Sequence, residues 1–172
     1  MKVAAVLTVS DSVHAGARQD RSGPAVRERL EALGWEVPVT GVVPDEEALI
    51  REKLLALADG NQVAAIFTTG GTGVARRDVT PEATRAVVER EIPGIGEMMR
   101  ARGRESTILA ALSRGLAGTR GQVLIVNLPG SPRGARESLD AILEVVPHVL
   151  DLLRGWTGHA DGERDATPGR PK

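Results

Sequence analysis

The stretch VAAIFTTGGTG, residues 63–73, is the most informative part of this 172-residue chain. Its apolar first half indicates a buried strand, and the small residues that follow indicate a loop at the end of that strand. Glycine at positions 70, 71 and 73 lets a backbone approach a ligand where a Cβ atom would collide, and loop amides can point at an anion. The pattern therefore predicts a loop that holds a phosphate-bearing ligand.

The segment after this loop predicts the start of a helix. Thr80 is a good N-cap residue, Pro81 suits the first helical position and Glu82 suits the first turn. Asp78 lies just before them. It acts either on a ligand or as the residue that organises the turn.

Two common phosphate-binding motifs do not fit the loop. A P-loop ends in Gly-Lys-Ser or Gly-Lys-Thr, whereas Gly73 is followed by Val74 and Ala75. A dinucleotide fingerprint has a third glycine three positions after its Gly-x-Gly pair, where this chain has Arg76. Any nucleotide chemistry must therefore follow the pattern of another family.

The composition indicates one globular domain. Apolar residues make up 41% of the chain, and its length is sufficient for one α/β core. The absence of cysteine excludes disulfides and thiolate chemistry. A net charge of −1 and an aromatic content of 2% argue against nucleic acid as a partner. No apolar run reaches the roughly 20 residues of a membrane span, and the N-terminal residues do not resemble a signal peptide, so we expect a cytoplasmic protein without membrane contact.

Strand and helix patterns alternate along the chain, which predicts a largely parallel sheet covered on both faces. We expect strands at 2–9, 35–43, 63–68 and 122–127, with a weaker one within 113–119. We expect helices at 24–33, 45–60, 80–90 and 93–102, and one from Ser131 that Pro147 kinks or splits. One domain should cover 1–157, followed by a disordered polar tail at 158–172.

Polar segments follow four of the predicted strands, which is where open α/β sheets bind ligands. They are residues 8–12, residues 43–45, the glycine loop with Asp78, and residues 127–132. Because the carboxyl ends of parallel strands lie at one edge of a sheet, we expect these segments to converge there. This convergence is stronger evidence for a site than any one motif.

Each candidate in these segments also has a purely structural interpretation. Asp45 precedes two glutamates and could serve only as a helix N-cap, while Ser10 and Asp11 could be turn formers. Ser131 precedes Pro132 and is a good N-cap, a role that is compatible with binding an anion at a helix N-terminus.

Basic residues offer few further assignments. Guanidinium groups suit phosphate oxygens, and the arginines close to the predicted edge are Arg76, Arg77, Arg114 and Arg133. Spacing does not say which of them binds a ligand. The three histidines are too widely separated to form a metal-ligand pair at helical spacing.

Four motifs in this order resemble the MogA/MoaB family of molybdenum-cofactor biosynthesis. They are TVSD at 8–11, TTGGTG at 68–73, RDVTPEAT at 77–84 and NLPGSP at 127–132. The resemblance extends over about residues 2–155. It implies a three-layer α/β/α fold and a homotrimer. It also implies a mostly parallel sheet with one antiparallel strand, for which the weak strand at 113–119 is the candidate.

The resemblance further implies adenylation of molybdopterin, in which its terminal phosphate attacks the α-phosphorus of Mg-ATP and pyrophosphate leaves. Asp45 and Asp78 are implied to be catalytic, with at least one of them holding Mg²⁺ or orienting the phosphates. The residues implied to bind molybdopterin or ATP are Ser10, Asp11, Asp20, Gly70, Gly71, Thr72, Gly73, Thr80, Pro81, Glu82, Asn127, Pro129, Gly130 and Ser131. A separate molybdate-inserting protein is the implied downstream partner.

Three other functions stay open at this point. A homologue could bind molybdopterin as an accessory or inactive protein without adenylyltransferase activity. The same fold could act as a non-enzymatic scaffold that needs a separate partner, or as a regulator that binds ATP tightly without a pterin. Release of pyrophosphate in the presence of molybdopterin and Mg-ATP would distinguish an enzyme from the accessory homologue, and copurification of a partner would reveal a scaffold.

Overall fold

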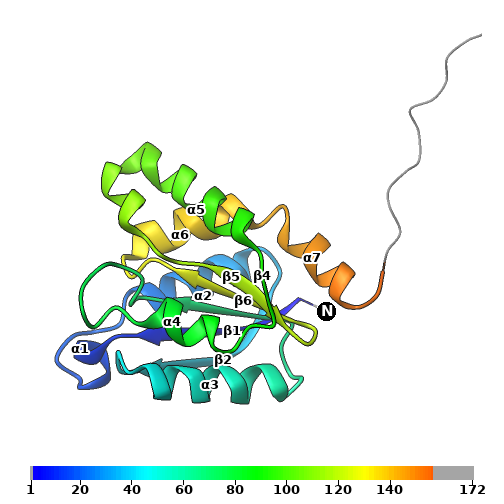
Figure 1. Cartoon of the computed structure of the whole chain (residues 1–172), viewed down its shortest axis with the longest axis horizontal. Helices are drawn as coiled ribbons and strands as arrows, with labels where there is room; N and C mark the ends of the chain where they lie inside the picture. Colours follow the sequence, from blue (N-terminus) through cyan, green and yellow to red (C-terminus); the bar gives the residue numbers. More distant parts are fainter. Residues whose placement is uncertain (1, 157–172) are drawn as a thin grey trace, which may run out of the picture.

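The computed structural model describes residues 2–156, which form a six-stranded sheet with helices on both faces (Figure 1). The strands are β1 (Val3–Val9), β2 (Glu36–Val43), β3 (Ala65–Thr69), β4 (Arg90–Glu91), β5 (Ala117–Arg120) and β6 (Val123–Leu128). The helices are α1 (Asp11–His14), α2 (Ser22–Ala32), α3 (Glu47–Asp59), α4 (Thr80–Arg85), α5 (Pro93–Ser106), the 3₁₀ helix η1 (Ile108–Leu112), α6 (Pro132–Ile142) and α7 (Val146–Leu153). The tail predicted at 158–172 lies outside the described residues.

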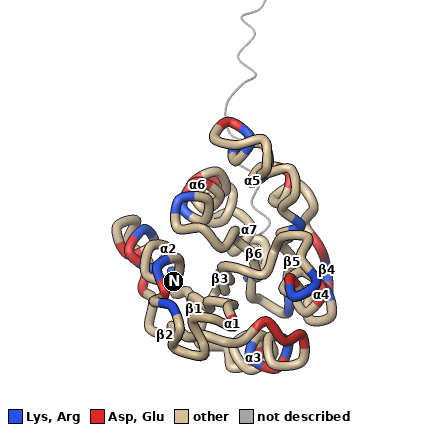
Figure 2. The backbone as a smooth tube through the Cα atoms, turned by 90° about the vertical axis from the view of Figure 1, so that its left-hand side faces the viewer, with Lys and Arg blue, Asp and Glu red and all other residues tan. Residues whose placement is uncertain are grey.

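The strand order β2-β1-β3-β6-β5-β4 builds a mostly parallel sheet. Neighbouring strands among β2, β1, β3 and β6 are parallel, whereas β5 runs antiparallel to both β6 and β4. Figure 2 shows the strands in this order, with α2, α5 and α6 on one side of the sheet and α3 and α4 on the other. The predicted three-layer fold is confirmed, and its antiparallel strand β5 overlaps the region where the sequence indicated a weak strand.

Each face of the sheet packs against helices through its own hydrophobic cluster. Every residue of β1 is buried, because a central strand in such a sheet is covered on both faces. Side chains alternate between the faces of a strand. Ala4 and Val6 therefore join the cluster that includes α2 and α6, while Ala5 and Leu7 join the cluster that includes α3. This packing holds the strand ends, and the loops that follow them, on a rigid frame.

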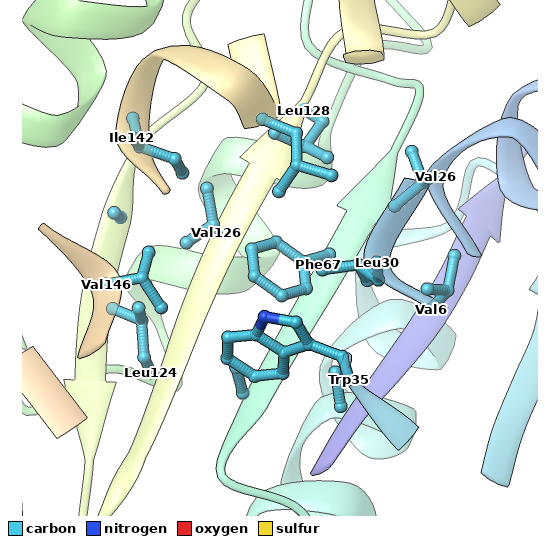
Figure 3. Packing of buried hydrophobic residues seen from close by; sticks show 14 of the residues in the cluster. Val6, Val26, Leu30, Trp35, Phe67, Leu124, Val126, Leu128, Ile142 and Val146 are labelled. Carbon is cyan, nitrogen blue, oxygen red and sulfur yellow. The ribbon is translucent and has the colours of Figure 1, made fainter. Parts of the chain in front are cut away.

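Phe67 of β3 lies in the cluster that includes α2 and α6 (Figure 3). Its ring meets the indole of Trp35 edge to face, with the ring centres 6.1 Å apart and the planes at 81°. Both rings are buried, and aromatic pairs favour this arrangement. The strand that precedes the glycine loop is therefore anchored in the core.

Sequence patterns identified most elements and missed the shortest ones. Helix α1 has four residues and β4 has two, which is too short to show a period, and α4 ends at Arg85 rather than near Arg90. The predicted effect of Pro147 is confirmed, because α6 ends at Ile142 and Pro147 lies in the first turn of α7. Within residues 2–156, no helix combines the length and the hydropathy that a membrane crossing requires.

Phe67→Ala should destabilise the fold strongly, since it leaves a cavity in a fully buried cluster. We expect the free energy of unfolding, measured by urea denaturation, to fall by about 3–5 kcal/mol. Val74→Ala is the control, because Val74 is 67% exposed. It should change stability by less than about 0.5 kcal/mol. A loss below about 1 kcal/mol for Phe67→Ala would contradict this packing.

Candidate active site

The carboxyl ends of four strands meet at one edge of the sheet, as the sequence predicted. Ser10 follows β1, Asp45 follows β2, Gly70 follows β3 and Pro129 follows β6. The N–H of Ser10 donates to the last carbonyl of β2 at 2.9 Å, and the N–H of Gly70 donates to the last carbonyl of β6 at 3.2 Å. These bonds join the beginnings of loops that lie far apart in the sequence.

Two adjoining cavities open at this edge. The first, here called the polar cavity, has a volume of about 560 Å³ and is lined by the loops after β1, β2 and β3. The second, here called the α5 cavity, has a volume of about 390 Å³, and α5 and η1 supply apolar residues to its wall, among them Met99, Leu109 and Leu112. Four wall residues belong to both cavities: Gly71, Asp78, Gly130 and Ser131. A ligand group at this shared wall can therefore face both cavities.

Most of the predicted site residues line one or both cavities. Those that line only the polar cavity are Ser10, Asp20, Asp45 and Gly70. Those that line only the α5 cavity are Thr72, Gly73 and Pro129. The predicted residues that line neither are Asp11, Thr80, Pro81, Glu82 and Asn127. Contact of this last group with a substrate stays a prediction.

Thr80 and Asn127 line neither cavity but hold the neighbouring loop and helix in place through hydrogen bonds. The Thr80 hydroxyl donates to the Gly70 carbonyl at 2.9 Å, and the N-cap position of α4 belongs to Val79, so the predicted N-cap role of Thr80 is wrong. The buried Asn127 amide donates to two threonine hydroxyls, one in β3 and one in α4, at 3.0 and 2.8 Å. Both residues tie α4 to the strand ends.

The glycine loop is shaped by the protein's own atoms. Gly70 and Gly71 have φ of 102° and 62°, a region that favours glycine. A Cβ atom at Gly70 would collide with the Val9 carbonyl, and one at Gly71 would collide with the Thr80 hydroxyl and lie 3.1 Å from Oδ1 of Asp45. The sequence suggested that these glycines leave room for a ligand. In the structure, a side chain at either position would first collide with the protein's own atoms.

Asp45 and Asp11 hold the loops after β2 and β1 together. The Asp45 carboxylate accepts a hydrogen bond from the Asp11 N–H at 2.7 Å, and the Asp11 carboxylate accepts one from the Asp45 N–H at 2.9 Å. The N-cap position of α3 belongs to Glu46, so the interpretation of Asp45 as the cap of this helix is wrong. Ser10 caps α1, where its hydroxyl accepts the N–H three residues later at 3.3 Å.

Of these two acids, Arg77 forms its ion pair with Asp11. Its Nε and Nη2 donate to the two oxygens of the Asp11 carboxylate at 2.9 and 2.8 Å, which holds the pKa of Asp11 below its usual range. Burial raises the pKa of Asp45, and the charges of Asp11 and Asp78 raise it further against the opposing Asp11 N–H bond. Asp45 is therefore the less compensated acid of the pair.

Asp78 organises its turn and also faces the site. Its Oδ2 accepts a hydrogen bond from the Ala75 N–H at 2.8 Å, and its own N–H donates to the Ala75 carbonyl at 2.9 Å. A Cβ atom at Gly73 would lie 2.8 Å from the same Oδ2, so glycine leaves room for this carboxylate. The structural interpretation of Asp78 is correct, and it coexists with a place on the wall of both cavities.

Ser131 and Asp20 occupy the starts of helices at the site. The Ser131 hydroxyl accepts the Gly134 N–H at 3.1 Å, which confirms it as the N-cap of α6. The Asp20 carboxylate accepts the Thr8 hydroxyl at 2.7 Å and the N–H groups of the first two residues of α2 at 3.1 Å. Helix N-termini favour anions, and at α2 the Asp20 carboxylate itself occupies that place.

Sequence reasoning missed the wall that α5 and η1 contribute. Met99 and Arg100 of α5 and Leu109 and Leu112 of η1 line the α5 cavity. An apolar run such as 108–112 is typical of core packing, yet Leu109 is 66% exposed. Only the position of η1 next to the glycine loop reveals that these residues border a cavity.

The acids at the site do not form a complete metal cage. Among the described residues, no three His, Cys, Asp or Glu side chains gather in a way that could hold an ion. Asp45 and Asp78 both line the polar cavity, and the Asp78 charge acts on Asp45. Two carboxylates and free space fit Mg²⁺, which takes oxygen ligands and keeps several waters.

Comparison with known proteins gives consistent matches. Residues 5–148 match the family model described as "Probable molybdopterin binding domain". A molybdopterin adenylyltransferase of Helicobacter pylori strain J99 is 41% identical over 155 residues, which cover 87% of this chain and 86% of that protein. The molybdopterin adenylyltransferase of Escherichia coli K12 is 40% identical over 164 residues, covering 87% and 84%.

A solved structure gives the same result. The molybdopterin biosynthesis enzyme MoaB from Thermus thermophilus superimposes with a TM-score of 0.85 at 52% identity. The match covers 90% of this chain and 98% of that chain. At this identity and coverage the likeness extends beyond the fold to most of the sequence.

Asp45 and Asp11 should change the pH dependence of stability in opposite directions. The raised pKa of Asp45 means that ionising it costs stability as the pH rises above about 4, whereas the lowered pKa of Asp11 means that its stabilisation is lost as the pH falls below that range. Urea unfolding of metal-free protein from about pH 3 to about pH 7 should show Asp45→Asn gaining stability relative to wild type as the pH rises, and Asp11→Asn losing it. A change of the same sign in both variants would contradict these assignments.

Proposed function

This chain belongs to the family of molybdopterin-binding domains of molybdenum-cofactor biosynthesis, and on that basis we propose that it is a molybdopterin adenylyltransferase. In the reaction, a terminal phosphate oxygen of molybdopterin attacks the α-phosphorus of ATP. A new phosphorus–oxygen bond forms as the bond to the leaving pyrophosphate breaks. The products are adenylyl-molybdopterin and pyrophosphate.

One observation carries the proposal: two cavities of substrate size adjoin at a wall made of Asp78, the glycine loop and the start of α6. Joining two phosphate-bearing molecules requires their reacting groups to meet while the remainder of each molecule lies in its own space. Transfer between phosphates depends chiefly on positioning and on charge stabilisation, and it needs no nucleophilic side chain. The shared wall meets that requirement.

Asp45 and Asp78 are the residues that would hold Mg²⁺. A cation between them would relieve the burial and the like charge that raise the pKa of Asp45. Mg²⁺ bound with ATP would neutralise phosphate charge as the transition state develops. Asp78 lines both cavities, which supports a proposed place for it close to both phosphates.

The start of α6 would position a phosphate. Ser131 lies on the shared wall as the N-cap of α6, whose eleven aligned peptide dipoles place a partial positive charge at this end. Pro132 has no N–H and the Gly134 N–H is bound to Ser131, so the Arg133 N–H is the helical donor that could meet a phosphate. Gly130 packs against Gly70, because a Cβ atom at Gly130 would lie 3.2 Å from the Gly70 Cα atom. This contact would let phosphate oxygens approach both loops together.

The resemblance to the MogA/MoaB family supports three further proposals. The protein would work in the cytoplasm, where ATP is supplied. It would assemble as a homotrimer, and it would pass adenylyl-molybdopterin to a separate molybdate-inserting protein. The accessory alternative, which binds molybdopterin without adenylating it, becomes an outcome of the experiment below.

Asp78→Asn should bind molybdopterin but lose at least about 100-fold in turnover, equivalent to roughly 2.7 kcal/mol of barrier. The amide oxygen of asparagine can still accept the Ala75 N–H, so the turn should persist while the negative charge is lost. The measurement is formation of adenylyl-molybdopterin from molybdopterin and Mg-ATP, followed by mass spectrometry and pyrophosphate release.

Asp140→Asn is the matched control, because Asp140 pairs with Arg29 and lies outside both cavities. It should keep wild-type turnover. Turnover of Asp78→Asn within about threefold of wild type would refute the role of this acid. A wild-type protein that binds molybdopterin but forms no product would refute the enzyme and favour the accessory homologue.

The proposed trimer should give a solution mass of about three times the 18.1 kDa of one chain. Apolar side chains on η1, led by Ile108 at 76% exposure, leave surface that self-association could remove from water. Sedimentation equilibrium at several protein concentrations measures this mass. A single-chain mass at every concentration would contradict the trimer.

A further inference from the structure

Arg114 lies between η1 and β5 and reaches across to the loop that carries Asp78. Its Nε donates to the Gly73 carbonyl at 2.7 Å, and its Nη2 donates to the Asp78 carbonyl. Its Nη1 pairs with the Glu82 carboxylate at the start of α4. One guanidinium thus binds both ends of the loop 73–78 and the helix that follows.

The same residue is also fixed through its backbone. The N–H of Arg114 donates to the Thr72 carbonyl at 2.8 Å. Its main chain and its side chain therefore bond to adjacent residues of the glycine loop, Thr72 and Gly73. Burial would raise the pKa of Glu82, but the hydrogen bond and the charge of Arg114 lower it, which keeps this pair ionised. Charged pairs of this kind are the stronger hydrogen bonds in proteins.

The loop has little else to hold it. Residues 74–77 are exposed, and the hydrogen bonds inside the loop run between Ala75 and Asp78. The only other bond from residues 74–78 to a different part of the described chain is the Arg77 pair with Asp11, which is itself exposed. Few apolar contacts therefore restrain the position of the Asp78 carboxylate.

We propose that Arg114 is the positioning residue that sets Asp78 at the wall between the two cavities. The neighbours of Arg114 in sequence, Ser113 and Gly115, line the α5 cavity, while its side chain holds the backbone of Asp78. Arg114 therefore connects one wall of the α5 cavity to the acid at the shared wall. Its effect on turnover rests on the proposed adenylyltransferase activity, whereas its effect on the loop does not.

Arg114→Lys is the test variant, because lysine keeps the charge but cannot form the planar fork that reaches three acceptors. Arg120→Lys is the matched control. Arg120 also forks to a carboxylate, that of Asp59, at 2.7 and 3.1 Å, and donates to the Val87 carbonyl at 3.4 Å, yet it lines neither cavity. Each variant replaces a guanidinium that bonds both a carboxylate and a backbone carbonyl, and the two positions are six residues apart.

The first measurement is hydrogen–deuterium exchange of the Ala75 and Asp78 amides, the two N–H groups of residues 73–78 that donate a hydrogen bond, in the ligand-free folded protein. We expect Arg114→Lys to speed exchange of these two amides at least about tenfold, because the loop loses the Arg114 bonds to both of its ends and keeps only the exposed Arg77–Asp11 pair as a tie to another part of the described chain. Arg120→Lys should leave them unchanged. Unchanged exchange in Arg114→Lys would overturn the inference whether or not the protein is an adenylyltransferase.

The second measurement is steady-state adenylation. Arg114→Lys should lower kcat at least about 30-fold with KM for ATP changed less than about threefold, and Arg120→Lys should keep the wild-type kcat and KM.

A double variant tests whether Arg114 acts through Asp78. If it does, Arg114→Lys/Asp78→Asn should be no slower than Asp78→Asn alone. A further loss in the double variant, or an unchanged kcat in Arg114→Lys, would overturn the positioning role. Absence of wild-type turnover would refute the proposed function, and exchange alone would then decide.

Discussion

The carboxyl ends of β1, β3 and β6 approach so closely that only glycine fits between them. A Cβ atom at Gly70 would collide with the Val9 carbonyl, and one at Gly130 would press on the Gly70 Cα atom. Gly70 also has a φ of 102°, a region that favours glycine, and its N–H donates to the last carbonyl of β6 at 3.2 Å. This contact determines where each loop leaves the sheet, so Ser10 and Ser131 come to the same edge although they belong to opposite ends of the chain.

Charge is the second constraint on this edge. The charges of Asp11 and Asp78 both act on Asp45, and the Arg77 fork pairs with Asp11 rather than with Asp45. Phosphate groups and uncompensated carboxylates repel one another, so an anionic substrate would enter this site more readily with a divalent cation. The helix N-terminus at Ser131 adds a favourable field from the opposite wall.

The loop between the glycines and α4 shows how an exposed segment can be held without a core of its own. Steric limits at Gly70 and Gly71 determine how it leaves the sheet, and the Thr80 hydroxyl fastens its far end to the Gly70 carbonyl. Arg114 then supplies from outside the hydrogen bonds that the loop cannot form within itself. The precision of the proposed site therefore depends on residues that line neither cavity.

Local pattern was sufficient wherever the physical cause is local. Apolar runs predicted β1, β3 and β6, and Ser131 was recognised as an N-cap because its bond reaches only three residues along the chain. The convergence of the four loops also followed from the sequence, since parallel strands end at one edge. The partners of Thr80, Asp45 and Arg114 could not be read in this way. Each of them bonds to a segment that is distant in sequence, and only folding brings the donor and the acceptor within about 3 Å.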